Sequence, residues 1–291
     1  MTAFVSWLLR RRYYLLILAI AITPLVPMLA VALIALDTIR RGPYQGLVSA
    51  AIAATGVLAL SAFVGSEPMV VGAVGVITML SGAALGAIVV TTHSLMLAYQ
   101  ASLLACAAAV GGALLIWPDA GALIGPSLDS LLEVLRQGGA APEQLEALNG
   151  LRSVFFGLVA AAVFAQLIVA IVLGYWWSSL AGLSKDVGQQ FRALRLGRIL
   201  GVPATLVMAV SLFIDAALVQ NLFPLVLFGF CFQGLAVTHA WAHAKHWNPA
   251  LLLVMYLLLV SPLTVVIVLA LGSMGLTDNW INLRAPLRSV S

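Results

Sequence analysis

The chain has 291 residues, of which 63% are hydrophobic and only 8% are charged. About a quarter of the residues of an ordinary soluble domain are charged, so this sequence cannot cover a water-exposed surface of normal polarity. We predict an all-α fold, a polytopic bundle of transmembrane helices, because its long apolar runs match a bilayer of about 30 Å. The formal net charge of +4 comes from arginines in loops. Basic clusters in such loops are typical of signals that orient a membrane protein, rather than of a nucleic-acid-binding surface.

Three arginines, 10–12, precede an apolar run at 13–36. A secretory signal also begins with basic residues, but its apolar core would be too short before the cleavage-like sequence at 19–21. We therefore predict a retained first span at 13–36. Pro24 and Pro27 lie within it and should kink or interrupt the helix.

Three further spans are predicted before the only long polar connection, at 44–64, 69–90 and 95–117. The second of these contains Gly82 and Gly86, a small-xxx-small pattern that lets two helix backbones approach closely. This pattern favours packing within the same bundle over a dimer interface.

The connection at 118–150 is acidic, since it carries five carboxylates and Arg136 alone. Spaced leucines predict a short amphipathic helix over 127–137, and Pro142 opens a second one over 142–149. With so few basic residues, these helices are poor candidates for binding anionic lipid. A plain interfacial linker is favoured here, with a lid on the bundle as the alternative.

A fifth span is predicted at 154–175 and ends in Trp176 and Trp177, whose rings favour the headgroup level. The basic stretch 181–198 follows. If it is helical, its three arginines face one side. We predict an interfacial helix with a cationic face formed by Lys185, Arg192, Arg195 and Arg198.

Three C-terminal spans bring the predicted total to about eight, with seven to nine tolerated: 200–218, 222–239 and 251–274. The chain 1–291 is then a single membrane domain. Residues 1–117 hold four N-terminal spans, 118–150 the acidic connection, 151–180 the fifth span, 181–198 the basic stretch, and 199–291 the three C-terminal spans and the tail. With eight spans, the arginines at 10–12 and those of the basic stretch 181–198 lie on opposite sides of the membrane. The positive-inside rule therefore cannot place both groups in the cytoplasm. One alternative removes the conflict: the first apolar run does not cross the membrane fully.

Asp215 is the only charged side chain inside a predicted apolar run. A carboxylate within a membrane is costly, so it is by default a candidate functional residue. Ser211 would share its helix face, whereas Gln220 and Asn221 could contribute only if the chain leaves the helix there. Alternatively, Asp215 lies close enough to the span end to be hydrated, and both interpretations stay open.

His239, His243 and His246 recur on one helix face. His239 and His246 would be about 10 Å apart along the axis, too far for one ion, and no carboxylate or cysteine is close in sequence. His239 and His243 are therefore weak metal candidates, and we expect no cofactor. The sequence contains no phosphate-binding loop, HExxH motif or GxSxG motif, so we predict no enzymatic activity.

Two short segments carry a resemblance to a known family. The Trp176-Trp177 helix end leading into FRALRL at 191–196, with the tail GLTDNWINLR at 275–284, resembles the YybS-like family of bacterial polytopic membrane proteins, a domain of unknown function. That family is distantly similar to the substrate-binding (S) subunits of energy-coupling-factor transporters. The resemblance implies a multi-pass protein of the bacterial inner membrane with a transporter coupling subunit as partner. Such subunits dock through alanines on their first span; here the nearest match, Ala50 and Ala54, lies on the second.

Two functions follow as hypotheses. The first is a solute-binding or transport subunit whose sixth and seventh spans form a pocket for an unidentified small molecule, lined by Ser211, Asp215, Asn221, Gln233 and the aromatic residues Phe228, Phe230 and Phe232. The alternative is a non-transporting scaffold or regulatory protein that recruits partners through the cationic face. In both, the lipid bilayer surrounds the protein and no nucleic acid is bound.

Overall fold

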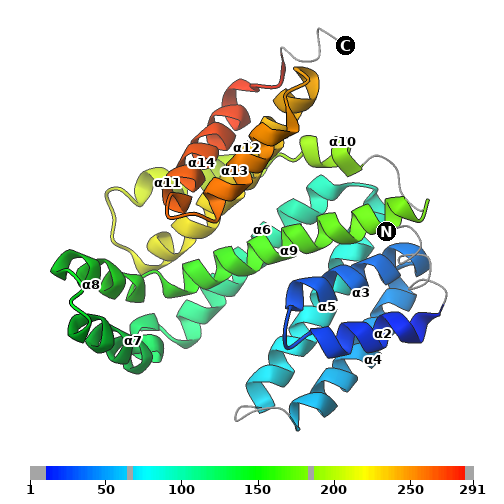
Figure 1. Ribbon diagram of the computed structural model, residues 1–291, viewed down its shortest axis with the longest axis horizontal. Helices are drawn as coiled ribbons and strands as arrows, with labels where there is room; N and C mark the ends of the chain where they lie inside the picture. Colours follow the sequence, from blue (N-terminus) through cyan, green and yellow to red (C-terminus); the bar gives the residue numbers. More distant parts are fainter. Residues whose placement is uncertain (1–10, 64–67, 183–186, 286–291) are drawn as a thin grey trace. The chain divides into compact units, whose positions relative to one another are not determined.

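The computed structural model describes residues 11–63, 68–182 and 187–285, and these ranges contain helices and no strand (Figure 1). Many large apolar side chains face outward, as a lipid-facing surface requires. Six helices in the described ranges are long and apolar enough to cross a membrane, which makes this a multi-pass helical membrane protein: α4 (Pro43–Ser61), α5 (Pro68–Thr92), α6 (Leu95–Ile116), α9 (Phe155–Leu180), α12 (Ala217–Ala244) and α14 (Thr264–Ile281).

The other elements are shorter or less apolar: α2 (Arg12–Ile22), α3 (Pro27–Arg41), α7 (Ala120–Gln137), α8 (Pro142–Asn149), the 3-10 turn η1 (Gly150–Arg152), α10 (Val187–Arg192), α11 (Gly197–Val210) and α13 (Pro249–Leu259). The chain forms two compact units. Unit 1 comprises Met1–Ser102 and Ala165–Leu194, and unit 2 comprises Leu103–Phe164 and Arg195–Ser291. Helices α6 and α9 therefore each contribute to both units.

Small residues let α3 and α5 pack closely in unit 1. A Cβ atom on Gly82 would lie 2.8 Å from the carbonyl oxygen of Val31, and one on Gly86 would lie 2.8 Å from that of Ala35. Both distances are too short for real contacts, so glycine is needed at both positions. The prediction that Gly82 and Gly86 pack within the bundle is confirmed.

The first apolar run, predicted as one span at 13–36 that its two prolines kink or interrupt, is interrupted in the structure. Helix α2 ends at Ile22, α3 begins at Pro27, and the two form an antiparallel hairpin (Figure 1). Arg12 at the start of α2 lies 4.0 Å from the carboxylate of Asp37 near the end of α3. The two prolines explain the break, because proline lacks an amide hydrogen and its ring clashes with the preceding helical turn.

Asp37 holds the open end of this hairpin together. Its side chain is only 1% exposed. It accepts hydrogen bonds from Arg41 Nε (2.8 Å) and from the hydroxyl of Ser49, and Arg12 Nε donates to the same hydroxyl (2.9 Å). A buried carboxylate needs such partners, and these ones join α2, α3 and α4 at one end of unit 1.

Gln190, in the described part of the basic stretch, lies beside the turn between α5 and α6, also within unit 1. The Gln190 side chain donates to the carbonyl of His93 (3.1 Å) and accepts from the amide of Leu95 (3.3 Å). Helix α5 ends on the same side as α3, because Gly86 packs against Thr38 in the last turns of α3. Residue 190 and the open end of the hairpin are therefore at the same end of unit 1.

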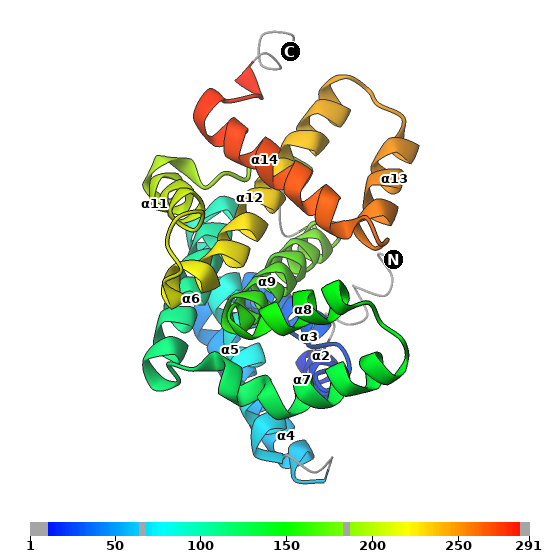
Figure 2. The same ribbon diagram turned by 90° about the vertical axis from the view of Figure 1, so that its left-hand side faces the viewer.

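Helices α12 and α14 form the centre of unit 2, with α13 leading from one to the other (Figure 2). The two helices run in the same general direction, because Gly272 packs against Leu227 and Gly275, three residues on, packs against Phe230, also three residues on. A Cβ atom on Gly275 would overlap the carbonyl oxygen of Phe230. Glycine thus sets the distance between these two helices.

Two of the predicted C-terminal spans are interrupted in the structure. The run 200–218 contains α11, which ends at Val210, and the run 251–274 contains the break between α13 and α14. Pro262 lies in that break and cannot donate a helical hydrogen bond. Together with the hairpin at 13–36, these interruptions explain why six helices of the described ranges, rather than the predicted eight, have the length and apolarity of spans.

Candidate functional site

A cavity of about 880 Å³ lies in unit 2 where α12 begins. Its walls come from three segments: the start of α7 with the chain before it, the turn that precedes α9, and the link between α11 and α12. The polar groups are mostly carboxylates and amides. They belong to Asp119, Asp129, Arg152, Ser153, Asp215, Gln220 and Asn221.

Asp215 lies outside any helix, so its predicted place inside a span is wrong. It is exposed in the link 211–216 between α11 and α12. Ser211 follows the last turn of α11 and donates to the carbonyl of Met208 (2.9 Å), so it does not share a helix face with Asp215. The side chain is exposed, and its carboxylate lines the cavity.

Gln220 organises this link. Its side-chain nitrogen donates to the carbonyls of Ser211 (3.1 Å) and Ile214 (3.2 Å) and to Oδ1 of Asp215 (3.3 Å). Because the chain leaves the helix before Asp215 and α12 starts at Ala217, Gln220 reaches back along the link. The Asp215 carboxylate therefore accepts one hydrogen bond from a side chain that is itself bonded to the backbone of the link.

Asn221 joins two segments that are distant in sequence and forms part of the cavity wall. Its nitrogen donates to the carbonyl of Ser153 (2.8 Å), and its oxygen accepts from the amide of Gly157 (2.9 Å). Glycine is required at 157, because a Cβ atom there would overlap the backbone of Asn221. The start of α12 is thus fixed to the start of α9.

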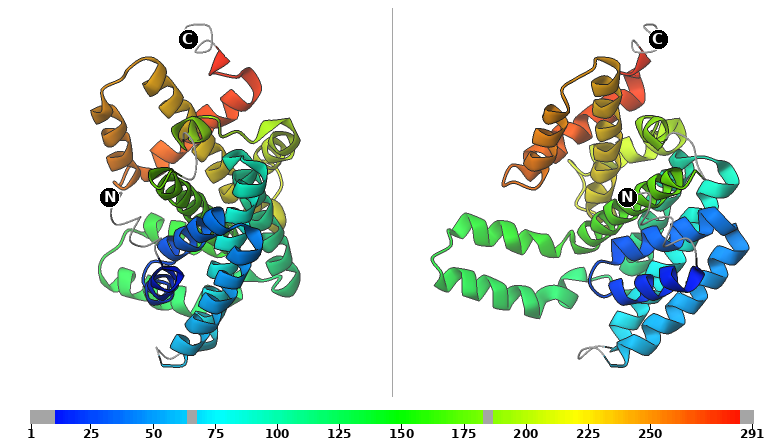
Figure 3. Two further views of the ribbon diagram at one scale, coloured as in Figure 1. Left: turned by 90° about the vertical axis from the view of Figure 1, so that its right-hand side faces the viewer. Right: turned by 45° about the vertical axis from the view of Figure 1, so that its right-hand side comes forward.

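Helix α7 supplies another wall of the cavity. It begins at Ala120, earlier than the predicted 127, and runs antiparallel to α8 (Figure 3). Asp129 on α7 forms an ion pair with Arg152. The Nε atom of Arg152 is buried and has no hydrogen-bond partner in the described part of the chain. This wall therefore carries a negative carboxylate, from Asp129, and a positive guanidinium, from Arg152.

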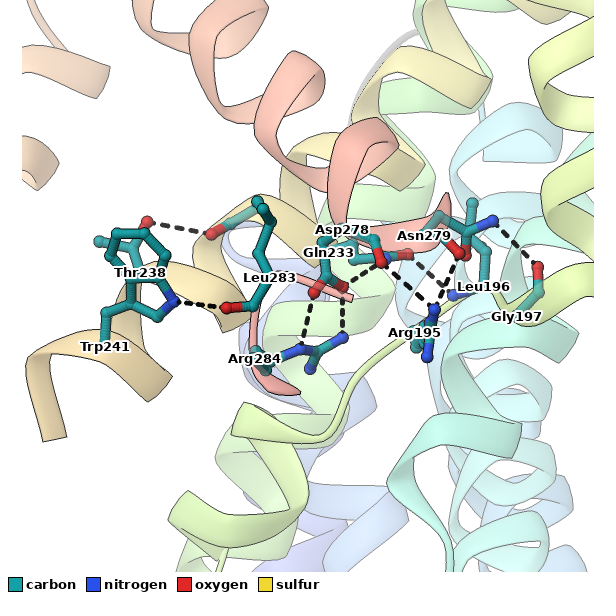
Figure 4. Close-up of polar contacts among 11 residues, drawn as sticks. Arg195, Leu196, Gly197, Gln233, Thr238, Trp241, Asp278, Asn279, Leu283 and Arg284 are labelled. Atoms are coloured by element: carbon teal, nitrogen blue, oxygen red, sulfur yellow. Dashed lines mark hydrogen bonds and ion pairs between the residues drawn. The ribbon is translucent and has the colours of Figure 1, made fainter. Parts of the chain in front are cut away.

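Gln233 does not belong to the cavity and contributes to a buried polar cluster elsewhere in unit 2 (Figure 4). At its centre is Asp278 of α14, whose side chain is 0% exposed. The carboxylate accepts hydrogen bonds from Gln233 Nε2 (2.8 Å) and Arg284 Nη2 (2.6 Å). We name this group, with Arg195 and Asn279, the Asp278 cluster.

The Asp278 cluster joins the two segments that carry the family resemblance. Arg195 donates to the carbonyls of Asp278 (3.2 Å) and Asn279 (2.8 Å) at the end of α14. The amide of Leu196 donates to Gln233 Oε1 (2.9 Å), which satisfies a backbone group where the chain is not helical. The cluster thus fixes the chain before α11 to α12 and α14.

The predicted cationic helix face is wrong for the described part of the basic stretch. Helix α10 ends at Arg192 and α11 begins at Gly197, so the chain is non-helical at Arg195. Arg192 belongs to unit 1, whereas Arg195 and Arg198 belong to unit 2. Lys185 lies outside the described residues.

His239, Phe230 and Phe232 each contact other residues of the protein. Both ring nitrogens of His239 have partners, the carbonyl of Leu235 (2.9 Å) and the hydroxyl of Tyr256 (3.2 Å). His243 is exposed at the end of α12, and the described residues contain no group of three or more potential metal ligands. Phe230 is fully buried and Phe232 packs edge-on against Phe164, so these rings form core rather than pocket.

Sequence reasoning gives no site role to Asp119, Asp129 and Arg152 in the cavity or to Asp278 and Arg284 in the cluster. All five lie in predicted loops or at span edges, where charges are ordinary. The signals are the acidic composition of the 118–150 connection for the cavity and the tail motif 275–284 for the cluster. No family model matches this sequence, and neither the curated proteins nor the solved structures contain a significant match.

Proposed function

We propose that this protein is a solute-binding or transport subunit of a membrane, with its ligand site in the cavity at the start of α12. The cavity carries this proposal, because its volume of about 880 Å³ suits a small molecule. Its polar groups are also pre-positioned, since Gln220 holds the 211–216 link and Asn221 fixes the start of α12. Binding then orders few side chains, which favours affinity.

The open end of the hairpin suggests which side the cavity faces. Arg12 and Arg41 lie at this end of unit 1, as does residue 190. If α6 and α9 each cross the membrane, the acidic connection between them is on the opposite side. The positive-inside rule then places the arginines in the cytoplasm and the cavity on the external side of a bacterial inner membrane. The hairpin thereby removes the charge conflict that eight spans create.

Cysteine labelling tests this orientation. Single cysteines are placed at Arg11, Gln144 and Gln189 in a variant without Cys106 and Cys231. We expect a membrane-impermeant maleimide to label position 144 in intact spheroplasts and to label positions 11 and 189 only after the membrane is ruptured. Labelling of 11 and 189 from opposite sides would show that the first run crosses the membrane.

Co-purification of a small molecule tests the function. We expect native mass spectrometry of the protein, purified in mild detergent, to detect a bound solute whose occupancy falls at least about tenfold in Asp215→Asn, because a charged hydrogen-bond acceptor is lost. Glu146→Gln is the matched control, since it removes an exposed carboxylate of α8 that does not line the cavity. Detection of lipid and detergent alone, or equal occupancy in both variants, would contradict the proposal.

The scaffold hypothesis has no observation that favours it. It depends on three arginines on one helix face, and Arg195 instead bonds to the end of α14 within unit 2. Docking of a coupling subunit through Ala50 and Ala54 is also disfavoured, because both are buried inside unit 1. A coupling subunit, if present, contacts a different surface.

A further inference from the structure

Helix α7 carries apolar side chains that the described residues leave largely uncovered. Leu123, Leu131 and Val134 are 50%, 47% and 65% exposed, and their spacing of eight and three residues places them on one side of the helix. Leu128 and Leu132, in contrast, are buried, and the main contacts of α7 are with α8 and η1. The hairpin of α7 and α8 thus uses only part of its apolar surface for its own packing. We name the remaining group, Leu123, Leu131 and Val134, the outer face.

The cavity-lining residues of α7 lie away from the outer face. Gly121, Gly125 and Asp129 line the cavity, and their spacing of four residues places them together on one side of the helix. At about 100° of rotation per residue, this side is turned away from the outer face. Helix α7 therefore separates the cavity on one side from an uncovered apolar surface on the other.

The place of α7 in the chain brings the outer face close to the membrane. The span α6 ends at Ile116 and α7 begins at Ala120, so even a fully extended link keeps these two residues within about 14 Å of each other. Leu115, Ile116 and Trp117 are exposed at the end of α6, and a tryptophan ring favours the headgroup level. The lipid-facing surface of α6 thus continues, after a short link, into the outer face.

Apolar burial, rather than charge, is what α7 offers a bilayer. Arg136 is the only basic residue of this helix, and it pairs with Glu133 (2.9 Å). We propose that α7 is an interfacial helix whose outer face inserts into the boundary between headgroups and acyl chains, in the leaflet at the end of α6. The lipid then holds the α7 wall of the cavity at the headgroup level, whichever solute the cavity binds.

Lipid contact can be measured residue by residue. Single cysteines are placed at Val134 on the outer face and at Arg136, whose side chain is equally exposed at 66%, in a variant without Cys106 and Cys231. Each is labelled with a nitrobenzoxadiazole fluorophore and reconstituted at one copy per nanodisc. The outer face is expected to lie about 5–10 Å into the interface, so phosphatidylcholine with brominated acyl chains should quench the label at 134 at least about twofold more than that at 136. Iodide in the water should show the opposite preference.

A second pair, Leu131 and Glu133, repeats the comparison, and we expect position 131 to behave like 134 and position 133 like 136. Replacing part of the phosphatidylcholine by phosphatidylglycerol should leave the preference unchanged, since α7 has no surplus of basic residues. Equal quenching by iodide at 134 and 136 would place the outer face in water and overturn the proposal. Protection of 134 from both quenchers would show that protein covers it, and a preference that needs the anionic lipid would show that charge drives the contact; either result also overturns the proposal.

Discussion

Replacing Asp278 by alanine is expected to lower the free energy of unfolding by about 3–5 kcal/mol, the cost of breaking a buried ion pair from one side. The side chain of Arg284 is only 11% exposed and would keep its charge without the carboxylate. Gln233 would also lose the acceptor of its 2.8 Å hydrogen bond. The measurement is unfolding in mixed micelles by titration with sodium dodecyl sulfate.

Asp129→Ala is the matched control. It also removes a carboxylate from an ion pair with arginine, but the Asp129 side chain is 66% exposed. We expect a loss of less than about 1 kcal/mol there, because water screens exposed pairs. The double variant Asp278→Ala with Arg284→Ala should be more stable than the sum of the single effects predicts. Equal losses for Asp278→Ala and Asp129→Ala would mean that the Asp278 cluster is open to water.

Gly275→Ala is expected to cost about 1–3 kcal/mol or more, although it adds a single methyl group. The new Cβ atom would overlap the carbonyl oxygen of Phe230 and lie 2.9 Å from the amide nitrogen of Gly234. Both contacts are backbone atoms of α12, so no side chain can rotate away. The helices must separate, and the same micelle titration, together with faster proteolysis of the 245–264 segment, should report it.

Gly111→Ala and Gly112→Ala provide the contrast within α6. A Cβ atom at either position would have nothing within 4 Å. Alanine is the better helix former by up to about 1 kcal/mol, so these variants should be neutral or slightly stabilising. Similar destabilisation at 111 and 275 would show that the close approach of α12 and α14 does not exist.

Composition and run length predicted the class of protein and most of its long helices. The predicted spans 44–64, 69–90, 95–117 and 154–175 correspond to α4, α5, α6 and α9, and the run 222–239 lies within α12. The packing of Gly82 and Gly86 was also foreseen, because a small-xxx-small pattern has a local cause. Hydropathy could not decide where an apolar run turns back, as it does between α2 and α3 and between α13 and α14.

The polar residues of the sites were harder to predict for a physical reason. Asp215 stands out because it interrupts an apolar run, yet Asp119 and Arg152, which line the same cavity, are about a hundred and about sixty positions earlier and join it only through the fold. Asp278 looked like a tail residue, since its burial depends on Gln233, Arg195 and Arg284 meeting around it. Contacts between residues that are far apart in the sequence cannot be recognised from the sequence alone.

The sequence by itself thus determined the solvent in which this protein resides and the helical form that its backbone must take, because a bilayer leaves a chain of this composition few alternatives. Only the tertiary structure decided that the first apolar run is a hairpin, that Gln233 belongs to the Asp278 cluster, and that Asp215 faces a cavity with Asp119 and Arg152. Those outcomes depend on which helix ends lie together. Packing between residues far apart in the chain sets that arrangement.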